Sequence, residues 1–189
     1  RYYLLKEVSF GNDGNISKEK LESCINSDLA NNYGNLCQRV VSFSEKNTNL
    51  KISNNITFNE EDKSVLSNYS KNYDKIISFV DNQDINSYIN FVVEQLFVAN
   101  KYFNDQEPWK KKSDPLRLNT IIYTSLELIR KITILLYPII PDTSKKVMKI
   151  FNLNLNDIKF ETIKNDEFIK KDSQINKIGI LFKKIVKND

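Results

Sequence analysis

Apolar side chains recur every three or four residues through most of the chain, a spacing typical of amphipathic helices. The first such stripe predicts a long helix that begins after Ser17, a candidate N-cap, and ends near residue 44. Its members are Leu21, Ile25, Leu29, Tyr33, Leu36 and Val40. At roughly 100° per residue, Asn35 and Arg39 lie together on a different face of this helix. We expect that polar face to hold Asp28, Asn31 and Asn32 as well.

Two more amphipathic stretches predict helices at residues 60–80 and 84–103. Polar segments separate these elements: a Gly- and Asn-containing loop is expected at residues 10–15, and an Asn-rich loop at residues 47–59. The chain then breaks near Pro108, because proline interrupts a helix.

The fourth predicted helix is the most apolar of all. It begins at Pro115, a residue type favoured at the first helical position, and Ser113 or Asp114 caps it. Its apolar residues are Leu118, Ile121, Ile122, Leu126, Leu128, Ile129, Ile132, Leu135 and Leu136. A helix that is apolar on most sides is expected at the centre of a bundle.

The remainder completes an all-α fold. Residues 137–146 end the fourth helix and start a fifth, which runs to about residue 151, and residues 177–185 are expected to dock on the bundle as an extended segment. Glycine and proline are scarce, at four each, which favours long helices over many short strands. The predicted class is an antiparallel helix bundle.

Composition restricts the chemistry that this chain can perform. It holds no histidine and only two cysteines, Cys24 and Cys37, so the usual zinc-ligand spacing is absent, and so is the commonest general base. No Gly-rich phosphate loop is present, and nearly all of the carboxylates are interpreted as solvated surface charges. The two lone cysteines fit a reducing compartment, so we expect a cytoplasmic protein, and no apolar run is long enough to span a membrane. The chain begins with Arg1, which indicates a piece of a longer protein.

Binding chemistry is better represented than catalysis. The only tryptophan, Trp109, follows Pro108 and precedes three lysines, 110–112, and the net charge is +4. An indole face stacks on unpaired bases and lysines meet phosphates, while Asn35 and Arg39 offer groups that bond base edges. From the residues alone, three alternatives remain open. Trp109 could be a core side chain under the corner, and Asn35 and Arg39 could be part of an ordinary solvated face. The lysines could be solvated surface charges that bind nothing.

Four blocks of sequence resemble the C-terminal part of methionyl-tRNA synthetase of the bacterial and organellar type, in the family's order and spacing. They are residues 1–17 (RYYLLKEVSFGNDGNIS), 26–39 (NSDLANNYGNLCQR), 99–110 (ANKYFNDQEPWK) and 135–146 (LLYPIIPDTSKK). In that family the Asn and Arg of Asn-Leu-x-x-Arg and the Trp of Pro-Trp contact the CAU anticodon. The resemblance therefore assigns anticodon binding to Asn35, Arg39 and Trp109, with Pro108 shaping the corner and Trp109 stacking on the first base, a cytosine.

The resemblance also implies a domain plan. Residues 17–152 would form the helical anticodon-binding domain of class I aminoacyl-tRNA synthetases, residues 1–16 the connection from a catalytic domain, and residues 153–189 a tail that docks on the bundle. The full enzyme would join methionine to tRNA(Met) using ATP and Mg²⁺. This chain lacks both ATP-site signatures and the zinc knob, so we expect no cofactor, no metal and no activity in it alone.

The partners implied are the anticodon loop of tRNA(Met) and the catalytic domain of the same protein. Two alternatives stay open: the anticodon-binding domain of another class I synthetase, and a non-catalytic helical scaffold that binds proteins. The other class I synthetases lack the combination of Pro-Trp with Asn-Leu-x-x-Arg, which argues against the first alternative.

Overall fold

The computed structural model describes residues 1–7 and 16–185, and within these residues every regular element is a helix. The longer helices are α1 (Tyr2–Glu7), α2 (Lys18–Cys24), η1 (Ile25–Gly34), α3 (Asn35–Thr48), α4 (Glu60–Lys71), α5 (Tyr73–Asp81), α6 (Ile85–Asp105), α7 (Pro115–Leu136) and α8 (Pro141–Met148). Short 3₁₀ turns are η2 (Pro108–Lys110), η3 (Lys149–Phe151), η4 (Leu155–Asp157) and η5 (Phe160–Lys164). The predicted all-α class is confirmed. The loop predicted at residues 10–15 lies outside the described residues.

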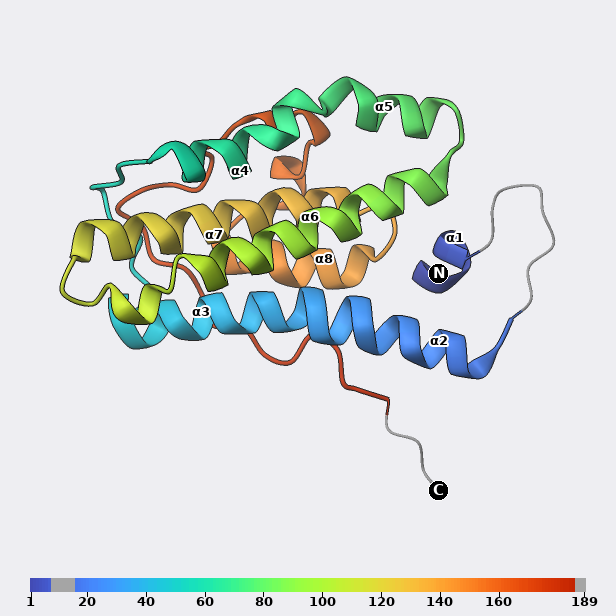
Figure 1. The fold of residues 1–189 in the computed structure, drawn as a ribbon, viewed down its shortest axis with the longest axis horizontal. Coiled ribbons are helices and arrows are strands. Elements are labelled where there is room, and N and C mark those ends of the chain that lie inside the picture. Colours follow the sequence, from blue (N-terminus) through green and yellow to red (C-terminus); the bar gives the residue numbers. More distant parts are fainter. Residues whose placement is uncertain (8–15, 186–189) are drawn as a thin grey trace.

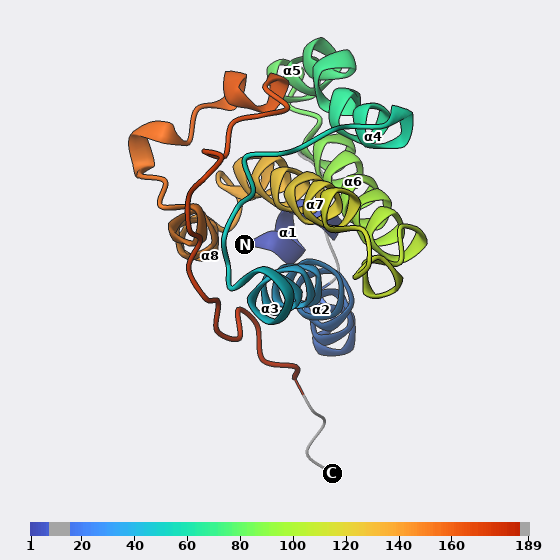
Figure 2. The ribbon, with the colours of Figure 1, turned by 90° about the vertical axis from the view of Figure 1, so that its left-hand side faces the viewer.

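The helices form a bundle around α7. Figure 1 shows α4 and α5 on one side, α6 and α7 in the middle, and the continuous helix α2–η1–α3 on the other side. The end-on view in Figure 2 places α7 between these layers, with α8 beside it. All residues from Thr120 to Leu136 are buried, and Asp114 Oδ1 caps the helix by accepting from the Arg117 backbone N–H at 3.0 Å. The most apolar helix is thus the central one, as its sequence predicts.

The first helix is longer than its apolar stripe predicts and has an unusual middle. It begins at the predicted cap, since Ser17 Oγ accepts from the Lys20 backbone N–H at 3.4 Å. It then runs without a break to Thr48, and η1 has π-helical hydrogen bonding. Apolar residues spaced four apart drift around an α-helix of 3.6 residues per turn. The wider π turns offset that drift and keep the stripe on the core.

The second predicted helix, 60–80, is wrong as a single element, because Asn72 divides it into α4 and α5. The Asn72 side-chain amide donates to the Asn68 carbonyl at 2.8 Å and to the Asn68 side chain at 2.9 Å. An asparagine that bonds the preceding turn in this way competes with the regular helical ladder. The start of α4 is regular, with Asn59 and Asp62 forming a reciprocal capping box.

Both cysteines are buried and unpaired, which fits their interpretation as small core side chains. Burial raises the pKa of the Cys24 thiol to about 11 and that of Cys37 also above its ordinary value. Neither thiol is therefore an activated nucleophile at neutral pH.

Three charged side chains on α7 are fully buried and hold the C-terminal segment against the bundle. Arg130 Nε donates to Glu127 at 2.6 Å, and its Nη2 donates to the Asn165 carbonyl at 2.7 Å. Glu127 Oε1 accepts from the backbone N–H groups of Phe168 and Ile169, each at 2.6 Å. Lys131 Nζ reaches Asp166 at 2.5 Å. The expectation that acidic side chains are surface charges is wrong for Glu127, because polar groups of a distant segment compensate its burial.

The segment 177–185 lies in extended form along the long first helix. Asn26 exchanges two hydrogen bonds with the Ile185 backbone, at 2.9 and 2.8 Å, and the Phe182 ring lies 6.4 Å from that of Tyr33. The segment passes Gly34, where an added Cβ would lie 3.5 Å from the Phe182 ring, an ordinary contact distance, and 3.0 Å from the Leu29 carbonyl of the same helix. Asn26 and Tyr33 therefore anchor the segment to the first helix.

Candidate nucleic-acid interface

The tryptophan corner follows the end of α6. Pro108 is buried at the first position of η2, and Trp109 projects from the next position with 43% of its surface exposed. The indole meets the ring of Phe103 edge to face, at a centroid distance of 6.5 Å and an interplanar angle of 71°. Trp109 is therefore a half-exposed platform resting on a buried aromatic ring, and not a core side chain.

Arg39 reaches the same aromatic ring from α3. Its Nη2 donates to Asn104 Oδ1 at 2.5 Å, and its guanidinium carbon lies 5.4 Å from the centre of the Phe103 ring. Phe43, one helical turn further along α3, contacts Phe103 edge-on at 5.9 Å. Phe103 is only 2% exposed, so it forms a fixed floor that supports both Arg39 and Trp109.

These groups enclose a shallow pocket of about 310 Å³, at the lower end of the range for small-molecule sites. It is lined by Arg39, Ser42, Phe43, Lys46, Phe103 and Trp109. Two of these six described side chains are cations and none is an acid. Aromatic faces next to cations suit an unpaired base with its phosphate.

Asn35 and the three lysines stand apart from this pocket. Asn35 is exposed on α3, one turn before Arg39, on the same side of the helix but outside the pocket lining. Lys110 forms an ion pair with Glu107 at 2.8 Å, and residues 110–112 are exposed without lining the pocket. The structure thus brings Arg39 and Trp109 together through Phe103, and leaves Asn35 beside them.

The polar face predicted for the first helix is partly wrong. Asp28 is buried and accepts from Lys6 Nζ at 2.7 Å and from the Tyr2 hydroxyl at 3.0 Å. Asn32 is also buried, and its side-chain oxygen accepts from Asn100 on α6 at 2.6 Å. These side chains pair across helix contacts with α1 and α6, whereas Asn31 and Asn35 of the predicted face are exposed.

The pocket also contains residues that its sequence motifs did not predict. The α3 residues of the pocket are Arg39, Ser42, Phe43 and Lys46, which have the i, i+3, i+4, i+7 spacing of one helical face. That spacing could have identified them once Arg39 was selected. Phe103 and Asn104 belong to a different helix, and only the packing of α6 against α3 reveals their role.

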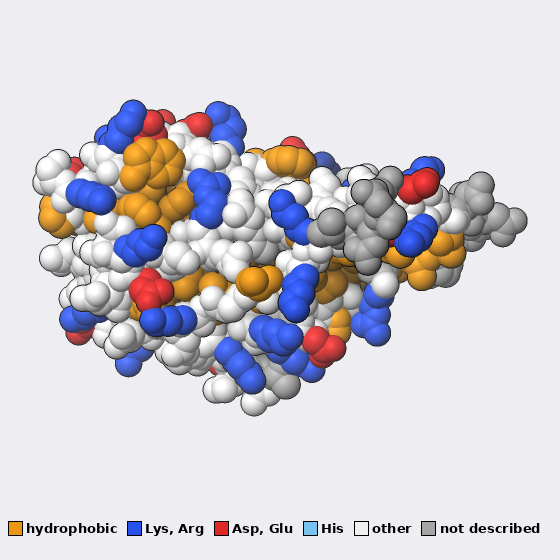
Figure 3. Space-filling view, turned by 90° about the horizontal axis from the view of Figure 1, so that it is seen from below, with side chains coloured by type: hydrophobic (Ala, Val, Ile, Leu, Met, Phe, Trp, Pro, Cys, Tyr) orange, Lys and Arg blue, Asp and Glu red, His pale blue; other side chains and the backbone are white. Residues whose placement is uncertain are grey.

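The wider surface is compatible with a polyanion. Figure 3 views the molecule from the side of the long first helix, where many Lys and Arg side chains and few Asp and Glu side chains appear. Hydrophobic side chains reach the surface at the left-hand end, where α3 ends. Cations that meet phosphates supply binding energy that does not depend on sequence.

Comparison with known proteins decides the family. A family model described as the anticodon binding domain of methionyl tRNA ligase matches residues 53–189. The chain belongs to this family. A second model, for class I tRNA synthetases of the methionine type, matches residues 1–41.

Solved and curated methionyl-tRNA ligases agree with this assignment. Methionine–tRNA ligase of Brucella suis is 36% identical over 151 residues, which is 79% of this chain and 29% of that protein. The apo methionyl-tRNA synthetase of Mycobacterium tuberculosis superposes with a TM-score of 0.91 at 28% identity, over 99% of this chain and 38% of that one. The same synthetase bound by methionyl-adenylate gives a TM-score of 0.89, again at 28% identity. This chain therefore spans about a third of the length of the ligases it matches.

Two further observations concern metal binding and membrane crossing. In residues 1–7 and 16–185, no group of three His, Cys, Asp or Glu side chains is arranged to hold a metal ion. None of the helices in this described part has the length and apolarity needed to cross a membrane.

Proposed function

We propose that this chain binds the anticodon loop of tRNA(Met) and supplies tRNA selection to a methionine–tRNA ligase. The observation that carries the proposal is the arrangement of Trp109 and Arg39 over one acid-free pocket, both resting on Phe103. In a family whose domain is described as anticodon binding, this pocket is the surface best suited to unpaired bases.

Each proposed side chain has a distinct task. Trp109 stacks on the first anticodon base, the cytosine of CAU, because half of the indole is open to solvent. Arg39 carries five N–H donors, one of which is engaged by Asn104, and the guanidinium contributes further hydrogen bonds to a base or phosphate. Asn35, one turn earlier, contributes amide contacts to base edges, and Pro108 fixes the corner.

We propose that the catalytic step takes place outside this chain. The parent enzyme would activate methionine with ATP and Mg²⁺ in the cytoplasm. The structure of a relative bound by methionyl-adenylate supports the use of ATP. In this plan residues 1–16 connect to the catalytic domain, residues 17–152 bind the anticodon, and residues 153–189 support the bundle.

Replacing Arg39 with alanine tests this function. Loss of a base contact is expected to weaken binding of a CAU stem-loop by about 1–3 kcal/mol and to relax discrimination against other loops. The measurement is the affinity for labelled CAU and non-CAU stem-loops at fixed salt concentration.

The matched control is Lys20→Ala, which removes the same charge from the exposed far end of the same continuous helix. Its affinity should stay near that of the unaltered chain. Equal losses in both variants would show that Arg39 contributes only its charge, and unchanged CAU discrimination in Arg39→Ala would contradict its proposed role.

A further inference from the structure

The corner that presents Trp109 has an unfavourable backbone conformation. Glu107 lies in the left-handed region, with φ of 44° and ψ of 56°, although it is not glycine. It also precedes Pro108, and a residue before proline normally prefers an extended conformation. Such a conformation costs about 1–3 kcal/mol of folding free energy and persists only where surrounding contacts hold it. Some contact must therefore fix this corner.

A buried ion pair lies directly beside the corner. Asp62, at the start of α4, is fully buried and receives Arg117 of α7 on both oxygens, at 2.5 and 2.9 Å. The Tyr102 hydroxyl donates to Asp62 Oδ1 at 2.6 Å, and the Asn59 backbone N–H donates to Oδ2 at 2.9 Å. The carboxylate is thus saturated with donors and joins α4, α6 and α7 at this end of the bundle.

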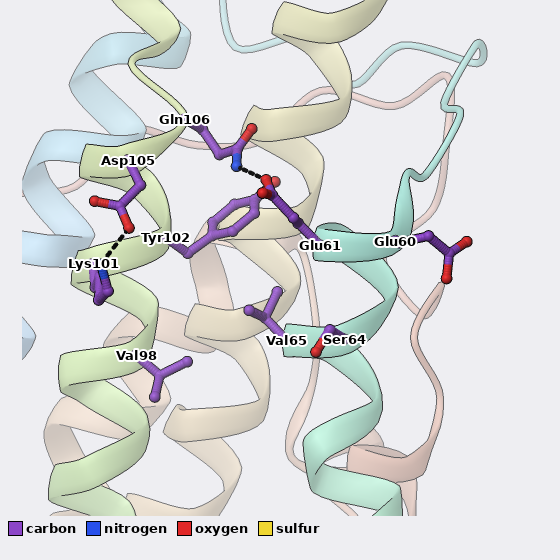
Figure 4. Close-up of a pocket in the computed structure, with 9 residues that line it drawn as sticks. All are labelled: Glu60, Glu61, Ser64, Val65, Val98, Lys101, Tyr102, Asp105 and Gln106. Atoms are coloured by element: carbon purple, nitrogen blue, oxygen red, sulfur yellow. Dashed lines mark hydrogen bonds and ion pairs between the residues drawn. The ribbon is translucent and has the colours of Figure 1, made fainter.

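Gln106 connects this ion pair to the corner. Its side-chain oxygen accepts from Arg117 Nη2, and its side-chain nitrogen donates to Glu61. Figure 4 shows the Gln106 side chain leaving the end of α6 and meeting Glu61 of α4 above the Tyr102 ring, at the rim of a pocket of about 610 Å³. The residue immediately before Glu107 is therefore bonded by its side chain to two other helices.

We propose that Gln106 is a positioning residue for tRNA recognition: its bonds to Arg117 and Glu61 hold the strained corner that projects Trp109. This inference rests on the proposed function, because it gives the corner a purpose only if Trp109 contacts RNA. Gln106 lies on the pocket in Figure 4 and not on the pocket under Trp109, so it acts through the backbone and touches no base.

The variant Gln106→Leu removes both bonds and keeps a side chain of similar size. Trp109 is the only tryptophan, so intrinsic fluorescence anisotropy reports the freedom of the corner directly. We expect anisotropy to fall while far-ultraviolet circular dichroism stays unchanged. If the productive corner is then populated about a tenth of the time, affinity for a CAU stem-loop falls about tenfold.

Gln95→Leu is the matched control. Gln95 is on the same helix, also bonds α4, and accepts from Asn68 at 2.7 Å, but it lies well away from the corner along α6. We expect a lower melting temperature with unchanged Trp109 anisotropy and unchanged affinity. A loss of affinity in Gln95→Leu equal to that in Gln106→Leu would overturn the proposal, because the effect would then follow stability alone.

A polarity exchange provides a rescue. Gln106→Glu alone places two carboxylates together and should weaken binding, whereas adding Glu61→Gln restores a donor and should recover anisotropy and affinity. If Gln106→Leu has the anisotropy and affinity of the unaltered chain, Gln106 does not position the corner, even if Trp109→Ala loses binding. If Trp109→Ala itself binds like the unaltered chain, the proposed function fails first.

Discussion

Replacing Trp109 with alanine is expected to weaken binding of a CAU anticodon stem-loop by about 1–3 kcal/mol, or roughly five- to 150-fold. The indole is half exposed above the buried Phe103 ring, so a stacked base would lose one entire face of contact. Since every base has an aromatic face, the loss should include part of the affinity for other loops, but it should be largest for CAU. The measurement is equilibrium binding of labelled stem-loops.

Two variants make this result specific. Trp109→Phe keeps an aromatic face and should retain more affinity than Trp109→Ala. Phe97→Ala removes another exposed aromatic ring, 61% accessible on α6, and should leave binding unchanged. A loss of affinity in Phe97→Ala as large as that in Trp109→Ala would mean that the RNA responds to exposed hydrophobic surface in general.

Glu127→Ala is expected to produce the largest loss of stability, about 3–5 kcal/mol in the free energy of unfolding. Its removal leaves Arg130 as a buried charge without its carboxylate partner, and it orphans the backbone N–H groups of Phe168 and Ile169. Urea unfolding monitored by circular dichroism measures this effect.

Lys18→Ala is the control for that stability measurement. Lys18 faces Glu22 at 3.9 Å with its side chain 87% exposed, and such surface pairs contribute less than about 1 kcal/mol. If Glu127→Ala and Lys18→Ala have equal unfolding free energies, the buried charges on α7 do not hold residues 162–169 in place.

The fold was predictable where the hydrophobic pattern of a single helix is sufficient to define it. The apolar run of α7 predicts a central helix, and its Asp114–Pro115 start predicts the cap that the structure shows. The same approach failed at Asn72, where the backbone leaves helical geometry with φ of −101° and ψ of 9° and the side chain bonds the preceding turn, within a continuous amphipathic pattern. A hydrophobic period reports which face is buried, and it does not report local competition for backbone groups.

The candidate site was predictable only in part for a related reason. Trp109 was identified by its position after Pro108. Arg39 was identified by its place on a polar face and by the resemblance of its segment to methionyl-tRNA synthetase. The floor under both, Phe103, belongs to an ordinary apolar stripe on α6, and Gln106 carries no motif of its own. Their importance arises from contacts between residues distant in sequence, such as Asp62 with Arg117, which no single stretch of sequence contains.

Anticodon recognition by Trp109 is tested most directly by titrating the chain with RNA stem-loops while the emission of this tryptophan is recorded. We expect saturable quenching with a CAU loop, because a stacked base alters the indole's surroundings. When the same stem carries a permuted loop, quenching should be weaker and should require a higher RNA concentration. Modest dependence on salt should accompany it, since the net charge is only +4. Emission that stays constant with every loop, or changes equally with all of them, would contradict anticodon recognition by this surface.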